Sequence, residues 1–141
     1  MKRQASLFCA AIALIAVIVV GSGFAQSHLK LHADIPFEFV ASNVTFPAGH
    51  YTVRAMQPGR VLIQSADYRN AEVVMTIPQA TGRTSEETKL IFNRYGNKYF
   101  LSQIWTRGDD TGRQLLKSRA ERETVANLKS DQPTTIAATV K

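Results

Sequence analysis

The sequence predicts a mainly β protein, an antiparallel β-sandwich or partly open barrel of about six strands with one C-terminal helix. Three observations lead to this class. Residues 29–39 alternate between apolar and polar side chains, short apolar runs farther on are separated by turn-forming residues, and the composition after Gly112 becomes helix-forming. With 141 residues the chain is long enough for one domain.

The first residues have the pattern of a secretory signal peptide. Lys2 and Arg3 precede an uncharged apolar run, Leu7–Val20, and Gly23-Phe24-Ala25 supplies small residues at both recognition positions. We therefore expect residues 1–25 to be removed during export. An uncleaved anchor is the alternative, although the apolar core is shorter than the roughly 20 residues of a membrane-spanning helix.

The exported chain would contain no cysteine, because Cys9 lies in the signal peptide. This excludes disulfides and thiolate chemistry. Basic residues exceed acidic ones, which favours contact with anionic envelope polymers or membrane surfaces, but they are scattered from Lys30 to Lys141 without a run. We expect no nucleic-acid partner, and membrane contact only through the signal peptide during export.

The first strand is predicted from Leu29 to Phe39. Pro36 cannot donate a backbone hydrogen bond, so the strand should lie at a sheet edge or change partner there. Pro47-Ala48-Gly49 suits a tight turn, and a second strand should follow from His50 to Met56.

Two short strands and a loop come next. The strands are expected at Val61–Gln64 and Glu72–Ile77, and the segment Gln79–Glu87 is the longest plausible internal loop. Such loops are where binding functions most readily lie.

A β-hairpin is predicted from Thr88–Tyr95 and Lys98–Thr106, joined by Gly96-Asn97. In-register pairing places one set of apolar side chains on the core face of this hairpin. This set contains Leu90, Phe92, Tyr99, Leu101 and Trp105.

The C-terminal part has helix-forming composition from Arg113 to Lys129, with favourable pairs at i, i+4 spacing. We expect a modest surface helix there. The predicted organisation is thus a signal peptide at residues 1–25, a single β domain ending in a helix at residues 26–129, and a flexible polar tail at residues 130–141.

Histidines provide the one candidate metal site. On the first strand His32 and Asp34 fall on the same polar side, together with His28, and His50 begins the next strand. Two imidazoles and a carboxylate on one face could bind zinc or copper. The competing interpretation is that alternating strands place polar side chains outward in any case.

Catalytic and cofactor signatures were not found, so we expect a protein that is not an enzyme and needs no cofactor. There is no G-x-S-x-G elbow and no phosphate-binding glycine loop. Carbohydrate binding is an alternative function, because Tyr68, Tyr95 and Trp105 could form an exposed stacking platform. The competing interpretation is that aromatic residues fill the core or are ordinary turn residues.

Three segments resemble a loose family of small, exported, uncharacterised bacterial proteins rich in β-structure. They are Ile35-Pro36-Phe37-Glu38-Phe39, the run Phe46-Pro47-Ala48-Gly49-His50-Tyr51-Thr52-Val53, and Gly112 with Leu115, Ser118 and Glu121. The resemblance implies export and a β-rich fold, and it implies no activity. Together these patterns predict a periplasmic or secreted, envelope-associated binding or structural protein whose partner is an envelope protein or a polysaccharide.

Overall fold

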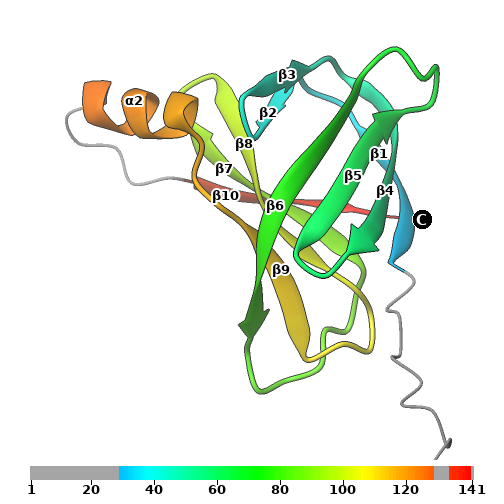
Figure 1. Cartoon of the computed structure of the whole chain (residues 1–141). Helices are drawn as coiled ribbons and strands as arrows, with labels where there is room; N and C mark the ends of the chain where they lie inside the picture. The colour runs from blue at the N-terminus through cyan, green and yellow to red at the C-terminus, as the bar shows by residue number, and fades with distance from the viewer. Residues whose placement is uncertain (1–28, 129–133, 141) are drawn as a thin grey trace, which may run out of the picture.

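The structure, a computed structural model, describes residues 29–128 and 134–140. Ten strands and one helix lie within these ranges (Figure 1). Their bounds are β1 Lys30–Ile35, β2 Phe39–Ala41, β3 Val44–Phe46, β4 Gly49–Gln57, β5 Arg60–Ser65, β6 Ala71–Ala80, β7 Lys89–Tyr95, β8 Lys98–Trp105, β9 Thr111–Leu115, α2 Arg119–Asn127 and β10 Thr134–Thr139. The mainly β class with one helix is confirmed, with more strands than the six expected. The predicted signal peptide lies outside the described residues.

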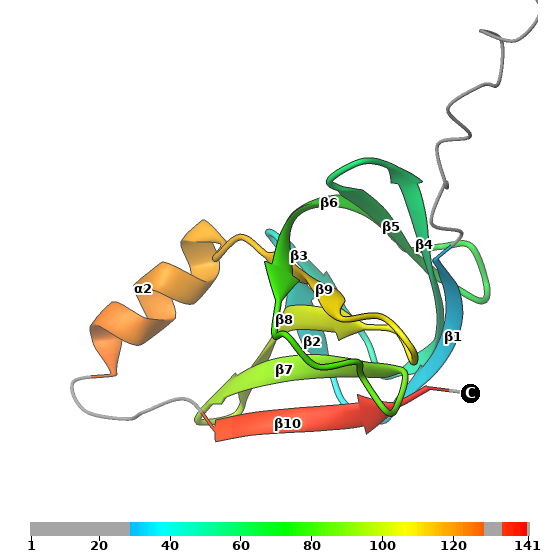
Figure 2. The same ribbon diagram turned by 90° about the horizontal axis from the view of Figure 1, so that it is seen from below.

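The strands form one strongly curved, mixed sheet. Its order is β1-β4-β5-β6-β9-β8-β2-β3, and β7 pairs with both β8 and β10. All ladders are antiparallel except the β2–β8 contact at Val40 and Phe100. A single bridge between Ala33 and Val140 joins β1 to the end of β10, so the curled sheet in Figure 2 is not closed by a full ladder.

The prediction for Pro36 is confirmed. Strand β1 alternates exposed and buried residues and pairs with β4, with Leu31 opposite Val53. Pro36 follows its last residue, and β2 then pairs with β3 and β8 instead. The proline therefore marks the point where the chain stops pairing with β4 and begins to pair with β3 and β8.

Aromatic rings fill the interior beside this point. Phe39 stacks on Phe46 at 5.1 Å between ring centroids and meets Tyr51 and Phe92 edge-on at 5.2 and 5.5 Å. The Tyr51 hydroxyl donates to the Pro47 carbonyl and so ties β4 to the preceding turn. Burial, and to a smaller extent the charge of Asp67, raises the pKa of Tyr51.

The predicted hairpin is confirmed as β7 and β8, with Gly96 at φ +59° in the turn. One detail of its register was predicted wrongly. A bulge between Ile91 and Phe92 places Ile104 opposite Leu90, and Trp105 consequently lies on the other face. The Trp105 ring packs on Gly112 there, where an added Cβ would come within 2.7 Å of the ring.

The C-terminal segments differ from two expectations. Residues 113–115, expected to be helical, belong to β9 because they pair with β6 and β8, and the helix itself begins at Arg119. The prediction of a flexible tail was also wrong for residues 134–139. These residues form β10, which pairs with β7 and places Ile136 opposite Phe92. Pairing with a strand edge outweighs the weak local preferences of both segments. No helix in the described ranges is long and apolar enough to span a membrane.

Candidate functional site

The predicted metal residues lie on the exposed outer face of β1 and β4. Asp34 and His50 are cross-strand neighbours, with 3.3 Å between the carboxylate Oδ1 and the imidazole Nδ1. His32 instead contacts Thr52, at 3.1 Å between Nδ1 and Oγ1. In the part of the chain that the structure describes, no group of three or more His, Cys, Asp or Glu side chains could hold a metal ion. The structure therefore brings Asp34 and His50 together but does not join His32 to them as a third ligand.

The same four side chains do not form a catalytic triad. A triad needs one imidazole that contacts both a hydroxyl and a carboxylate. Here the Thr52 hydroxyl contacts His32 and the Asp34 carboxylate contacts His50. The side chains of His50 and Asp34 are also 76% and 72% exposed, so water competes for their hydrogen bonds.

The predicted aromatic platform is not formed. Tyr95 and Trp105 are buried, whereas Tyr68 is 77% exposed. Tyr68 lies in the β5–β6 turn at φ +60°, and Ser65 and Asp67 hold that turn. The Ser65 hydroxyl, and after it the Arg69 backbone N–H, lower the pKa of the Asp67 carboxyl by hydrogen bonding.

The long loop after β6 is fastened to a neighbouring turn. Ser85 N–H donates to Asp109 O at 2.8 Å, and Gly108 N–H donates to Ser85 O at the same distance. Thr81 N–H donates to Asp110 O at 3.2 Å. These bonds join the predicted binding loop to the β8–β9 turn and leave it less free than its composition suggested.

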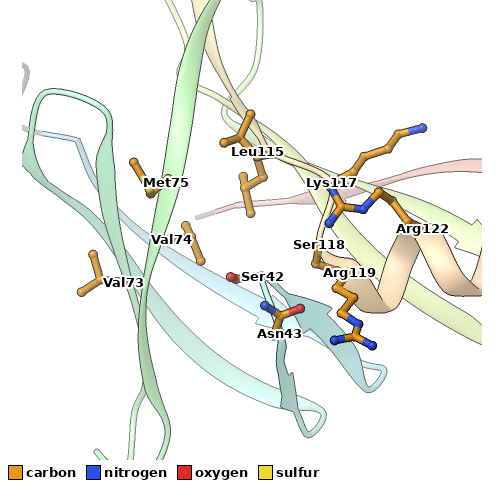
Figure 3. A pocket seen from close by; sticks show the side chains of 11 residues that line it. Ser42, Asn43, Val73, Val74, Met75, Leu115, Lys117, Ser118, Arg119 and Arg122 are labelled. Atoms are coloured by element: carbon orange, nitrogen blue, oxygen red, sulfur yellow. The ribbon is translucent and has the colours of Figure 1, made fainter.

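A groove lies between β6, the β2–β3 turn and the start of α2 (Figure 3). It encloses about 370 Å³, within the range of small-ligand sites, roughly 300–1,000 Å³. Its lining residues come from three distant parts of the sequence. They are Ser42, Asn43, Val73, Val74, Met75, Leu115, Leu116, Lys117, Ser118, Arg119 and Arg122.

Apolar side chains line the sheet side of the groove. Val73 and Met75 lie on the outward face of β6, and Met75 is 63% exposed. Leu116, just after β9, is also exposed. Ile77 continues the exposed stripe along β6 beyond the groove. Contiguous exposed apolar residues rimmed by polar ones are typical of interaction sites.

The opposite wall is α2, which a buried carboxylate anchors to the sheet. Glu121 is 4% exposed, and its Oε1 accepts hydrogen bonds from Asn93 Nδ2 at 3.1 Å and from the Tyr95 hydroxyl at 3.2 Å. Burial and the neighbouring Glu121 raise the pKa of Tyr95. The helix start is capped by Ser118, whose hydroxyl accepts from the Glu121 backbone N–H at 3.1 Å.

Three basic residues give this wall its charge. Arg119 Nε lies 2.7 Å from Glu123 Oε1, so a carboxylate already occupies it. Among the residues described, neither Lys117 nor Arg122 takes part in an ion pair. Figure 3 shows the Arg122 guanidinium directed from α2 toward the sheet and the Lys117 ammonium directed away.

This groove was not predicted from the sequence. Its one local signal is the run Glu72–Ile77, where apolar residues occupy both faces of a strand: Val74 is buried, whereas Val73 and Met75 are exposed. A half-buried strand would carry polar residues on the outer face. The basic wall had no such signal, because its placement depends on the contact between Glu121 and β7.

A scan against protein-family models and searches of curated proteins and of solved structures found no significant match to this chain.

Proposed function

We propose that the chain is an exported, non-enzymatic binding protein of the bacterial envelope and that the groove between β6 and α2 is its binding surface. The observation that carries the proposal is the exposure of Val73, Met75 and Ile77 on the outward face of β6, next to a groove that Arg122 lines from α2. The signal-peptide pattern of residues 1–25 supports export. The partner is a component of the envelope.

The arrangement suits binding better than catalysis. Exposing Val73 and Met75 to water is unfavourable, and covering them in a complex releases about 25 cal/mol per Å² of apolar surface. Among the described residues, the groove lining contains no histidine, aspartate, glutamate or cysteine that could act as a general base or nucleophile.

Export is tested with the full chain, carrying a C-terminal tag, produced in a bacterium. The proposal expects the product in the periplasm or the medium, with a mass that lacks residues 1–25. A charge placed in the apolar run, Leu14→Arg, should keep the protein in the cytoplasm. Cytoplasmic protein of full length from the unaltered chain would contradict the proposal.

Groove binding is tested by cosedimentation of the exported protein with isolated envelopes. Met75→Asp places a charge on the apolar side of the groove and should weaken binding about tenfold or more, which corresponds to about 1.4 kcal/mol. The matched control is Met56→Asp, because Met56 is similarly exposed and does not line the groove. Equal binding by the two variants would exclude the groove as the binding surface.

A further inference from the structure

We propose that the partner at the groove is an envelope protein whose extended, acidic peptide segment adds one short strand to the uncovered edge of β6. This inference rests on the proposed binding function and adds the class of partner. Three features of the described residues carry it: a stretch of β6 with a strand on one side only, polar groups across the groove from that stretch, and a cationic lining without acidic residues.

Strand β6 has its two neighbours over different parts of its length. On one side β5 pairs with residues 71–75, and on the other side β9 pairs with residues 76–80. Strand β9 ends at Leu115, opposite Thr76, and the chain then continues to α2 (Figure 3). Within the described residues, the edge of β6 from residue 71 to residue 75 therefore has no ladder on the side of the groove.

The register shows which backbone groups of β6 face this uncovered side. In an antiparallel ladder, the N–H and C=O groups of successive residues point alternately toward the partner strand and away from it. Thr76 N–H donates to Gly59 O, and Ser65 N–H donates to Asn70 O, both at 2.8 Å and both on the β5 side. Val73 lies an odd number of residues from both Thr76 and Asn70, so its N–H and C=O point away from β5. Val73 also lines the groove, and its donor and acceptor are thus placed to pair with an added strand.

Polar groups lie across the groove from this edge. Ser42 and Asn43 form the turn between β2 and β3, and Figure 3 shows the Ser42 hydroxyl directed toward β6. A peptide in the groove would have a second backbone edge, whose polar groups also need partners. The turn can supply them. Because the turn and α2 bound the groove opposite β6, it suits a single extended segment better than the edge of a second sheet.

The charge of the lining indicates an acidic segment. Lys117, Arg119 and Arg122 all line the groove, and no aspartate or glutamate is among its described lining residues. Arg119 is paired with Glu123, whereas the Arg122 guanidinium is directed toward the sheet. A guanidinium presents a planar set of donors that matches a carboxylate. An aspartate or glutamate of the peptide is therefore expected to contact Arg122.

The exposed side chains of β6 have a separate part in this interaction. Val73 and Met75 lie on the outward face of the strand, away from α2 (Figure 3). Side chains of an added strand alternate between the two faces of the sheet, so every second one would lie beside Val73 and Met75. We therefore expect apolar residues at alternate positions of the peptide.

The class of partner is tested by cosedimentation of the exported protein with isolated envelopes, before and after the envelopes are digested with proteinase K. A peptide partner requires that digestion abolish binding. Binding that survives digestion would indicate a polysaccharide or lipid partner and would overturn the inference.

The backbone contact is tested at Val73. Val73→Pro removes the N–H that faces the groove and none that pairs with β5, and should weaken envelope binding about fivefold or more. The matched control is Val73→Thr, which keeps the N–H and the β-branched shape and should change binding less than about twofold. Urea unfolding verifies that both variants are folded. Ala71→Pro, at the start of the strand, is the second variant if Val73→Pro does not fold.

Amide hydrogen exchange tests the uncovered edge without any substitution. In the unbound protein the Val73 amide should exchange at least about tenfold faster than the Val74 amide, because only Val74 donates to β5. Equal protection of the two amides would show that the edge is already covered and would overturn the inference.

The charge contact is tested at Arg122. Arg122→Ala should weaken envelope binding about tenfold, because a hydrogen bond to a charged group is lost. The matched control is Lys98→Ala, since Lys98 is an exposed cation outside the groove, and it should leave binding unchanged. Equal binding by the two variants would contradict an acidic segment.

The outcomes separate this inference from the proposed function. If envelope binding depends on Met75 but is unaffected by Val73→Pro or by proteinase K, the peptide partner is wrong and the binding function stands. If no substitution in the groove changes envelope binding, both proposals fail.

Discussion

Two exposed surfaces of this protein carry functional candidates, and they differ in how their side chains are partnered. On the outer face of β1 and β4, Asp34 contacts His50 and His32 contacts Thr52, each across the ladder. In the groove between β6 and α2, Val73 and Met75 face solvent and Arg122 has no ion-pair partner within the described residues. The polar side chains of the first surface contact one another. At the groove, apolar side chains and one cationic side chain remain exposed to solvent.

The difference shows which kind of exposed residue indicates a function. Polar side chains on an open strand face cost little and pair locally, so their clustering follows from the alternation alone. An uncovered apolar stripe has an unfavourable hydration free energy that local pairing cannot remove. The groove therefore has the stronger claim as a binding surface, although the sequence drew attention to the histidines.

The largest loss of stability should come from removing the Glu121 carboxylate, which holds α2 against the sheet. Glu121→Ala leaves the Asn93 amide and the Tyr95 hydroxyl without their shared acceptor, and we expect a loss of about 3 kcal/mol in unfolding free energy by urea titration. The pKa of Tyr95 should fall toward its usual value, because the charge of Glu121 and part of the burial are lost together. Ultraviolet absorbance titration would follow this change.

Glu123→Ala is the control for that anchor, since Glu123 lies two residues away on the same helix and is exposed. Its loss should change the unfolding free energy by less than about 0.5 kcal/mol. Similar losses for both variants would mean that Glu121 does not hold α2 against the sheet.

A smaller effect is expected at the helix cap. Ser118→Ala removes the acceptor for the Glu121 backbone N–H and should cost about 1 kcal/mol of stability. Fraying of the first turn would also disturb one wall of the groove and should weaken envelope binding. Ser118→Asn keeps a capping oxygen and should restore both properties, so an equally unstable Asn variant would argue against the cap.

The smallest change in stability should come from the Asp34–His50 pair on the outer face of β1 and β4. Asp34→Asn and His50→Gln, combined in a double-mutant cycle, should show a coupling below about 0.5 kcal/mol, because the pair is exposed to water. Binding to envelopes should not change. A large coupling, or loss of envelope binding, would move the functional surface from the groove to β1 and β4.

Local patterns predicted the elements whose partners are close in sequence. Gly96-Asn97 fits the turn between β7 and β8, and alternation with a proline at position 36 predicted β1 and its change of partner. The bulge opposite Ile91 and Phe92 was beyond such reasoning, because one extra residue in β8, Ser102, reverses the alternation. The groove was beyond it as well, since Asn43, Met75 and Arg122 meet only when three separate segments are packed.

The residues of the third resemblance motif also show the difference between what local sequence predicts and what distant contacts decide. The resemblance grouped Gly112, Leu115, Ser118 and Glu121, and the last three fall within the helix expected from Arg113 to Lys129. In the structure each residue has a separate role. Gly112 lies under Trp105, Leu115 enters the core, Ser118 caps α2 and Glu121 anchors it to β7.

By itself the sequence determined the β-rich class, the β7–β8 hairpin and the break at Pro36, because turn chemistry and side-chain alternation act over a few residues. The tertiary structure decided that residues 113–115 and 134–139 are strands and that residues of β6 and α2 line one groove. Those outcomes depend on strand edges and on a buried carboxylate supplied by distant segments, whose contacts outweigh local preference.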